Sequence, residues 1–323
     1  MQWIWVVEMF REWKEKEYIP KKQMMKLFIR GSLSLSKVLI KNFFRLKNLR
    51  KGEVSYTPPK RVYDLPSYSS DMKFIKSDEK YLRPTLFCNP YSPEIIAMAN
   101  KLGAFEKEPY EYANDVFEFV KRKVTLQIVP FWGVEETLRK GYGTCLHKIS
   151  LFIALCRVAG IKARYKLYAL SMIPQWYDTF ISPDPLMVEW YDAMGNFLFH
   201  GEGEAYIDGK WIVGDVGPLP ERQAATGIPI TKFGEDSIGI WFEAIPGGIM
   251  KTESLPLGLA TGMNLLLKVS PATVAKINNN VLALDEKGRK ILQEIGEEEY
   301  DKRVRKTYKM PKVELEKKSL IFE

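Results

Sequence analysis

Residues 141–164, GYGTCLHKISLFIALCRVAGIKAR, contain the pattern on which the fold depends. Two glycines near its start permit a close approach of the backbone, and Thr144 is a good N-cap residue for a helix. The run from Cys145 to Ala159 is apolar almost all round, and Gly160 is typical of a helix end. The pattern predicts a buried central helix with a cysteine in its first turn.

The position of Cys145 favours a reactive thiol. The first turn of a helix lies at the positive end of the helix dipole, next to backbone N–H groups without a partner, and both stabilise a thiolate. The chain's other cysteines, Cys88 and Cys156, fit the ordinary role of small core residues. Three cysteines without a CxxC pair argue against a disulfide framework and a zinc site. We expect a reducing compartment, no metal and no organic cofactor.

A thiolate that performs acyl transfer needs a partner that accepts and returns a proton, usually a histidine. The chain has two histidines. His147 follows Cys145 by two residues, so on a helix it points about 200° away from the thiol. This leaves His200 as the candidate proton carrier.

A hairpin is predicted shortly after this histidine. Asp208-Gly209 is a strong signal for a two-residue turn and would join strands at 204–207 and 210–213. In this register Tyr206 faces Trp211, and we expect the two rings to form a cross-strand core pair.

The same register sets the neighbours of His200. Glu202 opposes Asp215, while His200 and Asp215 lie on one face of the sheet, one diagonal step apart. Such neighbours are about 7 Å apart at the backbone, close enough for a carboxylate to accept the imidazole N–H. Two carboxylates then lie beside one imidazole, so either Asp215 or Glu202 could orient it and one is expected to be partly protonated. These residues alone do not bring the pair to Cys145.

Three separated blocks of the chain resemble the transglutaminase-like superfamily, over about 130 residues from near Pro93 to Asp215. The first is VEETL at 134–138 followed by Gly143-Thr144-Cys145, and the second is LFIALCRVAGIKAR at 151–164 with its Arg-x-x-Gly-x-x-Ala-Arg signature. The third is HGEGEAY at 200–206, followed by Asp208-Gly209-Lys210-Trp211 and then Asp215.

Two positions depart from the family pattern. Glu202 stands where the family has a tryptophan, and Lys162 replaces the common proline before Ala163. We expect the two arginines of the signature, Arg157 and Arg164, to hold the helix against the sheet rather than to bind substrate.

The resemblance implies an α+β, papain-like transglutaminase core in which a helical layer with Cys145 packs on an antiparallel sheet with His200 and Asp215. It also implies a thioacyl-enzyme on Cys145, with Asp215 as the preferred orienter of His200 and Glu202 as the alternative. The backbone N–H of Cys145 is one candidate oxyanion donor, and Trp132 or Gln127 a second one. We take Trp132 chiefly as a core aromatic.

Hydrolysis of amide bonds in a peptide or protein is the favoured activity, because resembling prokaryotic proteins are generally regarded as protease-like. A protein-crosslinking transglutaminase and acyl transfer to an arylamine are alternatives that use the same residues. A non-catalytic peptide-binding module is a third. Substrate identity and oligomeric state stay open.

Positive charge collects in residues 21–51, which hold ten Lys and Arg and no acid, against a net charge of +8 for the whole chain. As a helix this segment is amphipathic, with Lys37, Lys41 and Arg45 at four-residue spacing. Its opposite side carries Leu35, Leu39, Phe43, Leu46 and Leu49. We favour a terminal helix that packs its apolar side on the main domain and leaves its lysines in water. The alternative is docking on an anionic membrane surface, whereas nucleic acid is not expected because no stacking or recognition motif accompanies the charge.

Four regions follow from composition and patterning. They are a basic amphipathic helical segment at 1–52, a linker or extended wrap at 53–84, the catalytic core at 85–250, and a helical extension with a charged tail at 251–323. Helices are predicted at 93–103, 109–123, 134–140, 257–269 and 274–295. The short first apolar stretch is not a secretory signal and no apolar run approaches membrane-span length, so we expect a cytoplasmic protein, with peripheral membrane attachment as the alternative.

Overall fold

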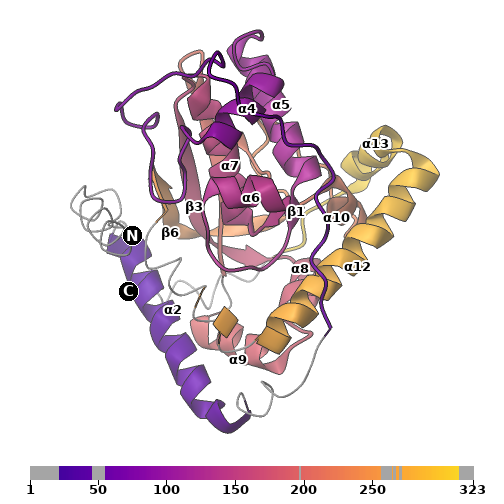
Figure 1. Ribbon diagram of the computed structural model, residues 1–323. Coiled ribbons are helices and arrows are strands. Elements are labelled where there is room, and N and C mark those ends of the chain that lie inside the picture. The colour runs from indigo at the N-terminus through magenta and orange to yellow at the C-terminus, as the bar shows by residue number, and fades with distance from the viewer. Residues whose placement is uncertain are drawn as a thin grey trace.

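A four-stranded antiparallel sheet lies against a layer of helices in the computed structural model of this protein (Figure 1). The model describes residues 22–45, 55–195, 198–255, 264, 267–268 and 271–312. The sheet has the order β5-β4-β3-β6. Its strands are β3 (Ala163–Met172), β4 (Leu198–Ile207), β5 (Lys210–Gly214) and β6 (Phe242–Thr252). This mixed architecture confirms the predicted fold class.

Helix α7 (Cys145–Val158) is the centre of the helical layer and packs on β3 and β4. It begins with a capping box of Thr144 and His147, and Gly160 follows it with a φ of 77°, which a residue with a side chain rarely adopts. Nearly every side chain of the helix is buried, because its apolar residues surround the axis. The predicted buried helix with Cys145 in its first turn is therefore confirmed.

Three further helices that the sequence predicts surround α7. They are α4 (Pro93–Lys101), α5 (Pro109–Lys123) and α6 (Val134–Lys140). A short parallel pair, β1 (Thr125–Leu126) and β2 (Tyr142–Gly143), leads into the start of α7. Proline at the first turn of α4 and α5 supplies a fixed φ where no backbone donor is needed, so both helices begin where predicted.

The predicted hairpin forms in the predicted register. Asp208 and Gly209 have φ values of 49° and 78° and join β4 to β5, with Tyr206 opposite Trp211. Two details differ from the prediction. Strand β4 begins at Leu198, so His200 lies inside the strand, because β3 continues to supply hydrogen-bond partners there. Tyr206 is 41% exposed, so its contact with Trp211 is a surface pair at the sheet edge and not a core pair.

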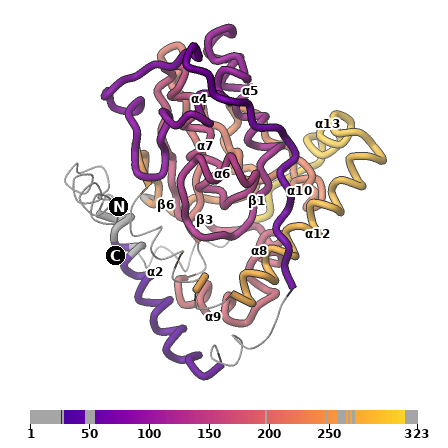
Figure 2. Tube along the Cα trace, viewed as in Figure 1, coloured from indigo at the N-terminus to yellow at the C-terminus, as the bar shows by residue number. Residues whose placement is uncertain are grey.

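Residues 55–84 run across the outside of the helical layer without helix or strand (Figure 2). The Tyr63 hydroxyl donates to the Leu138 carbonyl at 2.6 Å, and the Ile75 N–H donates to the Val158 carbonyl at 2.9 Å. These contacts are those of an extended wrap, while the exact boundaries of the four proposed regions stay a prediction.

The remaining helices extend the molecule away from the sheet. They are α2 (Lys22–Lys41), α8 (Pro174–Phe180), α9 (Pro185–Met194), α10 (Pro220–Ala225), α12 (Pro271–Ile295) and α13 (Glu297–Thr307). Helix α12 covers the predicted 274–295, and much of the charged tail forms α13, whereas most of the predicted helix at 257–269 and the tail from residue 313 onwards lie outside the described residues. Within the described parts of the chain, no helix combines the length and apolarity that a membrane crossing requires.

Helix α2 packs on α9, as the favoured interpretation of the basic segment expects. Val38 packs against Leu186 of α9 and Leu35 is buried as well, but Phe43, which the pattern places on the inner side, is 61% exposed. Phe43 points away from α9, whereas Asn42 and Arg45, on either side of it in the chain, reach Glu189 of α9.

Candidate active site

Three elements place Cys145, His200 and Asp215 together. Cys145 is the first residue of α7, His200 is the third of β4, and Asp215 follows β5 directly. His200 Nε2 lies 3.7 Å from Asp215 Oδ1, and the His200 imidazole also interacts with the Cys145 thiol. Asp215 is fully buried, His200 is nearly so, and Cys145 is partly exposed, so one side of the cluster is open to solvent.

The charges of this cluster support one another. Burial lowers the pKa of His200, but its neighbours Cys145 and Asp215 outweigh this effect and raise the pKa to about 10. Burial raises the pKa of Asp215, but the charges of His200 and Lys121 and the hydrogen bond from Ser237 bring it below its usual range. The arrangement therefore favours a protonated imidazole beside the Asp215 carboxylate.

Asp215 is held by donors on both carboxylate oxygens. The Gly217 N–H donates to Oδ1 at 2.9 Å and the Ser237 hydroxyl donates to Oδ2 at 2.6 Å. A Cβ at residue 217 would lie 2.9 Å from Asp215 Oδ1 and 3.1 Å from His200 Cε1. Glycine at this position thus permits the loop to close over the His200–Asp215 pair.

Glu202 lies beside this pair but has other partners. Its Oε2 accepts from Lys166 Nζ at 2.9 Å and its Oε1 accepts from the Ser237 N–H at 2.9 Å. Burial, followed by the charge of Asp215, raises the pKa of Glu202 to about 7, despite the opposing effect of Lys166. This geometry favours Asp215 as the orienter, while the assignment itself stays a prediction.

The candidate oxyanion donors differ in their availability. Both Trp132 donors have partners, because its backbone N–H donates to His147 Nε2 at 3.2 Å and its indole N–H to Thr137 Oγ1 at 3.0 Å. Gln127 is buried, and its amide donates to the Leu126 carbonyl at 2.6 Å. The backbone N–H of Cys145, at the first position of α7, has no carbonyl four residues earlier within the helix. The geometry favours this last donor.

His147 lies where the helical angle predicts, away from the thiol. Its ring packs on Phe131 and Trp132, and its Nδ1 lies 2.7 Å from Thr144 Oγ1. Burial lowers the pKa of His147 to about 3, so this imidazole is neutral and structural.

Three aromatic rings that sequence reasoning missed surround His200. Trp241 and Phe242 have ring centroids 5.5 Å from the imidazole, and Tyr168, directly opposite His200 on β3, is at 5.6 Å. Tyr168 follows from strand pairing, but Trp241 and Phe242 are about 40 residues away along the chain, where no spacing signal connects them to the site.

The two signature arginines are structural, as expected. Arg157 is fully buried and donates to the carbonyls of Ala163, Arg83 and Glu253. Arg164 donates to Glu204 Oε2 at 2.6 Å and stacks 3.7 Å from the Trp211 ring centroid.

Comparison with known proteins identifies the core. A family model described as the transglutaminase-like superfamily matches residues 96–216. Among solved structures, one described as a candidate cysteine protease of Cytophaga hutchinsonii is 19% identical, with a TM-score of 0.33 over 53% of this chain and 44% of its own. One described as a candidate protease of Parabacteroides distasonis is 19% identical, with a TM-score of 0.27 over 39% of this chain and 23% of its own.

The chain therefore spans less than half the length of either solved structure. A search of curated proteins finds no match. The family match falls on the segment that contains all three blocks of the predicted resemblance, so residues 96–216 match the transglutaminase-like superfamily as predicted.

Proposed function

We propose that this protein is a cysteine-dependent hydrolase of amide bonds in peptides or proteins, with Cys145 as nucleophile, His200 as proton carrier and Asp215 as its orienter. One observation carries the proposal. A partly exposed thiol at a helix N-terminus interacts with an imidazole whose Nε2 lies 3.7 Å from a buried carboxylate.

The chemistry proceeds in two balanced steps. The Cys145 thiolate attacks the amide carbonyl carbon, the C–N bond breaks, and the His200 imidazolium gives its proton to the leaving amine. Water then attacks the thioester carbonyl while His200 takes one of its protons. The C–S bond breaks, which releases the carboxylic acid and regenerates the thiolate. The backbone N–H of Cys145 is placed to stabilise the oxyanion in both steps.

The first test is alkylation of the three cysteines by iodoacetamide as a function of pH, followed by peptide mass mapping. We expect Cys145 to react rapidly at neutral pH in the wild type. In His200→Ala its reaction should need the alkaline pH of an ordinary thiol, whose pKa is roughly 8.5. Cys88 and Cys156 are internal controls, because burial raises the pKa of both thiols. Ordinary behaviour of Cys145 in both proteins would overturn the proposal.

The second test identifies the acceptor. A library of peptides is incubated with the wild type and with Cys145→Ala in ¹⁸O-labelled water, in the presence of a labelled primary amine. Hydrolysis predicts new peptide carboxyl groups that carry ¹⁸O and are absent with the variant. Incorporation of the labelled amine into the peptides, without ¹⁸O, would show that the acceptor is an amine and that the activity is crosslinking and not hydrolysis. The thioester intermediate would be the same in both cases.

A further inference from the structure

The outer side of α2 and of the turn that follows it exposes large apolar side chains. Five of them form a surface that we call the apolar stripe, defined by Ile29 (53% exposed), Leu33 (58%), Ile40 (76%), Phe43 (61%) and Phe44 (78%). At 100° per residue, the three that lie on α2, Ile29, Leu33 and Ile40, fall within about 40° of the helix circumference. No described element covers this side of α2 (Figure 1).

The opposite side of α2 is fixed on α9, which sets the direction of the stripe. Val38 packs against Leu186, the Ser34 hydroxyl donates to the Ala193 carbonyl at 3.0 Å, and Lys41 pairs with Glu189 at 3.1 Å. The helix therefore cannot rotate to bury the apolar stripe without breaking these contacts.

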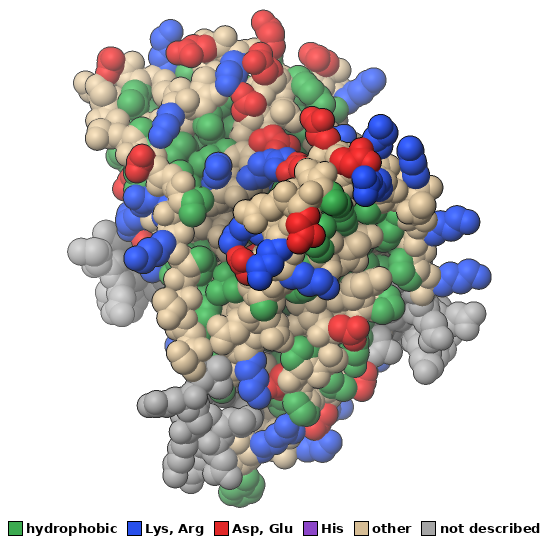
Figure 3. All heavy atoms as spheres, turned by 90° about the vertical axis from the view of Figure 1, so that its right-hand side faces the viewer, with side chains coloured by type: hydrophobic (Ala, Val, Ile, Leu, Met, Phe, Trp, Pro, Cys, Tyr) green, Lys and Arg blue, Asp and Glu red, His purple; other side chains and the backbone are tan. Residues whose placement is uncertain are grey.

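Basic side chains lie along one edge of the stripe. Lys26, Arg30 and Lys37 line a hollow of about 390 Å³ together with Ile29 and Leu33. The last turn of α2 adds Lys41, and the first turn contains no acid. Elsewhere on the molecule, on the face that includes α12 and α13, acidic and basic side chains alternate (Figure 3).

We propose that α2 docks this protein on an anionic phospholipid bilayer, with the apolar stripe in the headgroup–acyl boundary and Lys26, Arg30 and Lys37 beside the phosphates. Adjacent apolar and basic surfaces on one exposed helix face match the two layers of such a boundary. A polyanion such as nucleic acid would be complementary to the cations but would leave the aliphatic side chains of the stripe in water. This inference is independent of the proposed hydrolase activity.

The test is co-sedimentation of the full chain with vesicles, using phosphatidylcholine alone or mixed with phosphatidylglycerol. We expect binding to the mixed vesicles that weakens as salt rises. The variant K26Q/R30Q/K37Q should bind on the order of 100-fold more weakly at low salt, because each basic residue near an anionic surface contributes severalfold. The variant I40S/F43S/F44S should also bind the mixed vesicles more weakly than the wild type. Its remaining binding should be more sensitive to salt than that of the wild type, because only the charges still contribute.

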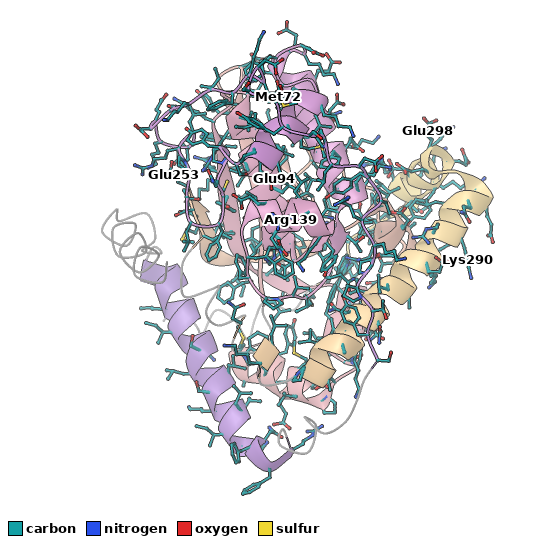
Figure 4. All side chains as sticks on the ribbon, viewed as in Figure 1. Met72, Glu94, Arg139, Glu253, Lys290 and Glu298 are labelled. Atoms are coloured by element: carbon teal, nitrogen blue, oxygen red, sulfur yellow. The ribbon has the colours of Figure 1, made fainter. Side chains whose placement is uncertain are left out.

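A matched control removes the same charge from the other side of the molecule. K287Q/K290Q/K302Q changes three exposed lysines on α12 and α13, and Lys290 lies on the opposite side of the molecule from α2 (Figure 4). All substituted side chains in the three variants are exposed, and circular dichroism verifies their folding. We expect the control to bind like the wild type.

Three results would overturn the proposal. The first is no sedimentation with the mixed vesicles. The second is an equal loss in K26Q/R30Q/K37Q and in the control, which would indicate net charge without a docking surface. The third is undiminished binding of I40S/F43S/F44S together with tight binding of a DNA oligonucleotide, which would indicate a polyanion site.

Discussion

At the scale of single residues, His200 connects the other two members of the proposed triad through its charge. Its pKa is about 10 in the folded protein and about 6.5 in an unfolded chain. A raised folded-state pKa means that the protonated imidazole stabilises the fold. This contribution is complete below about pH 6.5 and is lost as pH rises towards about 10.

We therefore predict that the difference in free energy of unfolding between the wild type and His200→Asn falls between about pH 6.5 and pH 10. Asparagine is the matched substitution because it keeps a polar side chain but does not titrate. Chemical denaturation at a series of pH values measures the difference. A difference that is constant over this range would show that the imidazole is not held in its charged form.

Ser237 bridges the two buried carboxylates of the site, through its hydroxyl to Asp215 and its N–H to Glu202. Ser237→Ala removes one donor from Asp215 and leaves that carboxylate oxygen without this partner. We predict a loss of about 1–3 kcal/mol in the free energy of unfolding. Slower alkylation of Cys145 should accompany this loss, because His200 loses part of its orientation.

Ser36→Ala is the matched control for this substitution, since the Ser36 hydroxyl is exposed and bonds only to the Ser32 carbonyl one turn earlier. Denaturant titration and the rate of iodoacetamide labelling are measured on both variants. Equal behaviour of Ser237→Ala and Ser36→Ala would contradict the bridging role.

At the scale of elements, Lys148 ties the cysteine helix to the loop behind Asp215. It lies one turn after Cys145 and is fully buried, and its Nζ donates to the carbonyls of Lys121 and Gly217 at 3.2 and 3.1 Å. Burial, followed by the charge of Arg222, brings the pKa of Lys148 well below its usual value. The amine of Lys148 thus connects α7 to α5 and to the loop that contains Gly217.

We predict that Lys148→Met lowers the free energy of unfolding by about 1–3 kcal/mol, because two buried carbonyls lose a donor. Lys148→Ala should cost about 2–5 kcal/mol, since it also leaves a cavity. The unfolded chain keeps the proton up to about pH 10.4, so the wild type should gain stability relative to Lys148→Met as pH rises towards that value. Denaturation at neutral and alkaline pH tests both statements, and a falling difference would contradict the lowered pKa.

At the scale of the whole molecule, the long helix α12 packs on α10. The Arg222 guanidinium pairs with Asp285 at 2.7 Å, and both side chains are buried. Gly288, one turn further along α12, lies so close to α10 that a Cβ there would be 1.6 Å from the Glu221 carbonyl oxygen. Because the obstacle is backbone, the two helices must move apart if this residue acquires a side chain.

We predict that Gly288→Ala destabilises the protein by more than 3 kcal/mol. The higher helix propensity of alanine contributes only about 1 kcal/mol in the other direction. Lys287→Ala, an exposed neighbour in the same turn, is the control and should be nearly neutral. Thermal denaturation of the two variants is the measurement, and a Gly288→Ala protein as stable as the control would refute this packing.

Features with a local cause could be predicted. Helices α5 and α6 have their predicted bounds because each has local start and end signals. Proline begins α5, two acidic residues stand in the first turn of α6, and both helices end in a basic last turn. The Asp208-Gly209 turn sets the hairpin register, since both residues adopt positive φ and a one-residue slip would reverse every side chain. That register is why the His200–Asp215 pair was predictable without knowledge of the rest of the fold.

Features that depend on distant segments could not be predicted. Ser237 and Trp241 reach the site on the segment between β5 and β6, and Phe242 reaches it as the first residue of β6. Lys166 reaches Glu202 by pairing of β3 with β4. Their residue types are common in cores and loops, and no spacing relates them to His200. The exposure of Tyr206 and Phe43 also depends on which elements pack beside them. The periodicity of apolar residues carries no information about these neighbours.

By itself the sequence determined the buried cysteine helix, the hairpin and the His200–Asp215 pair, because helix caps, apolar periodicity and turn residues act over a few positions. The tertiary structure alone decided that Cys145 meets this pair, that Lys166 and Ser237 donate hydrogen bonds to the Glu202 carboxylate, and that the apolar stripe faces outward. The physical reason is that burial and charge depend on which surfaces pack together. Packing joins residues such as Cys145 and Asp215, which lie 70 positions apart in the chain.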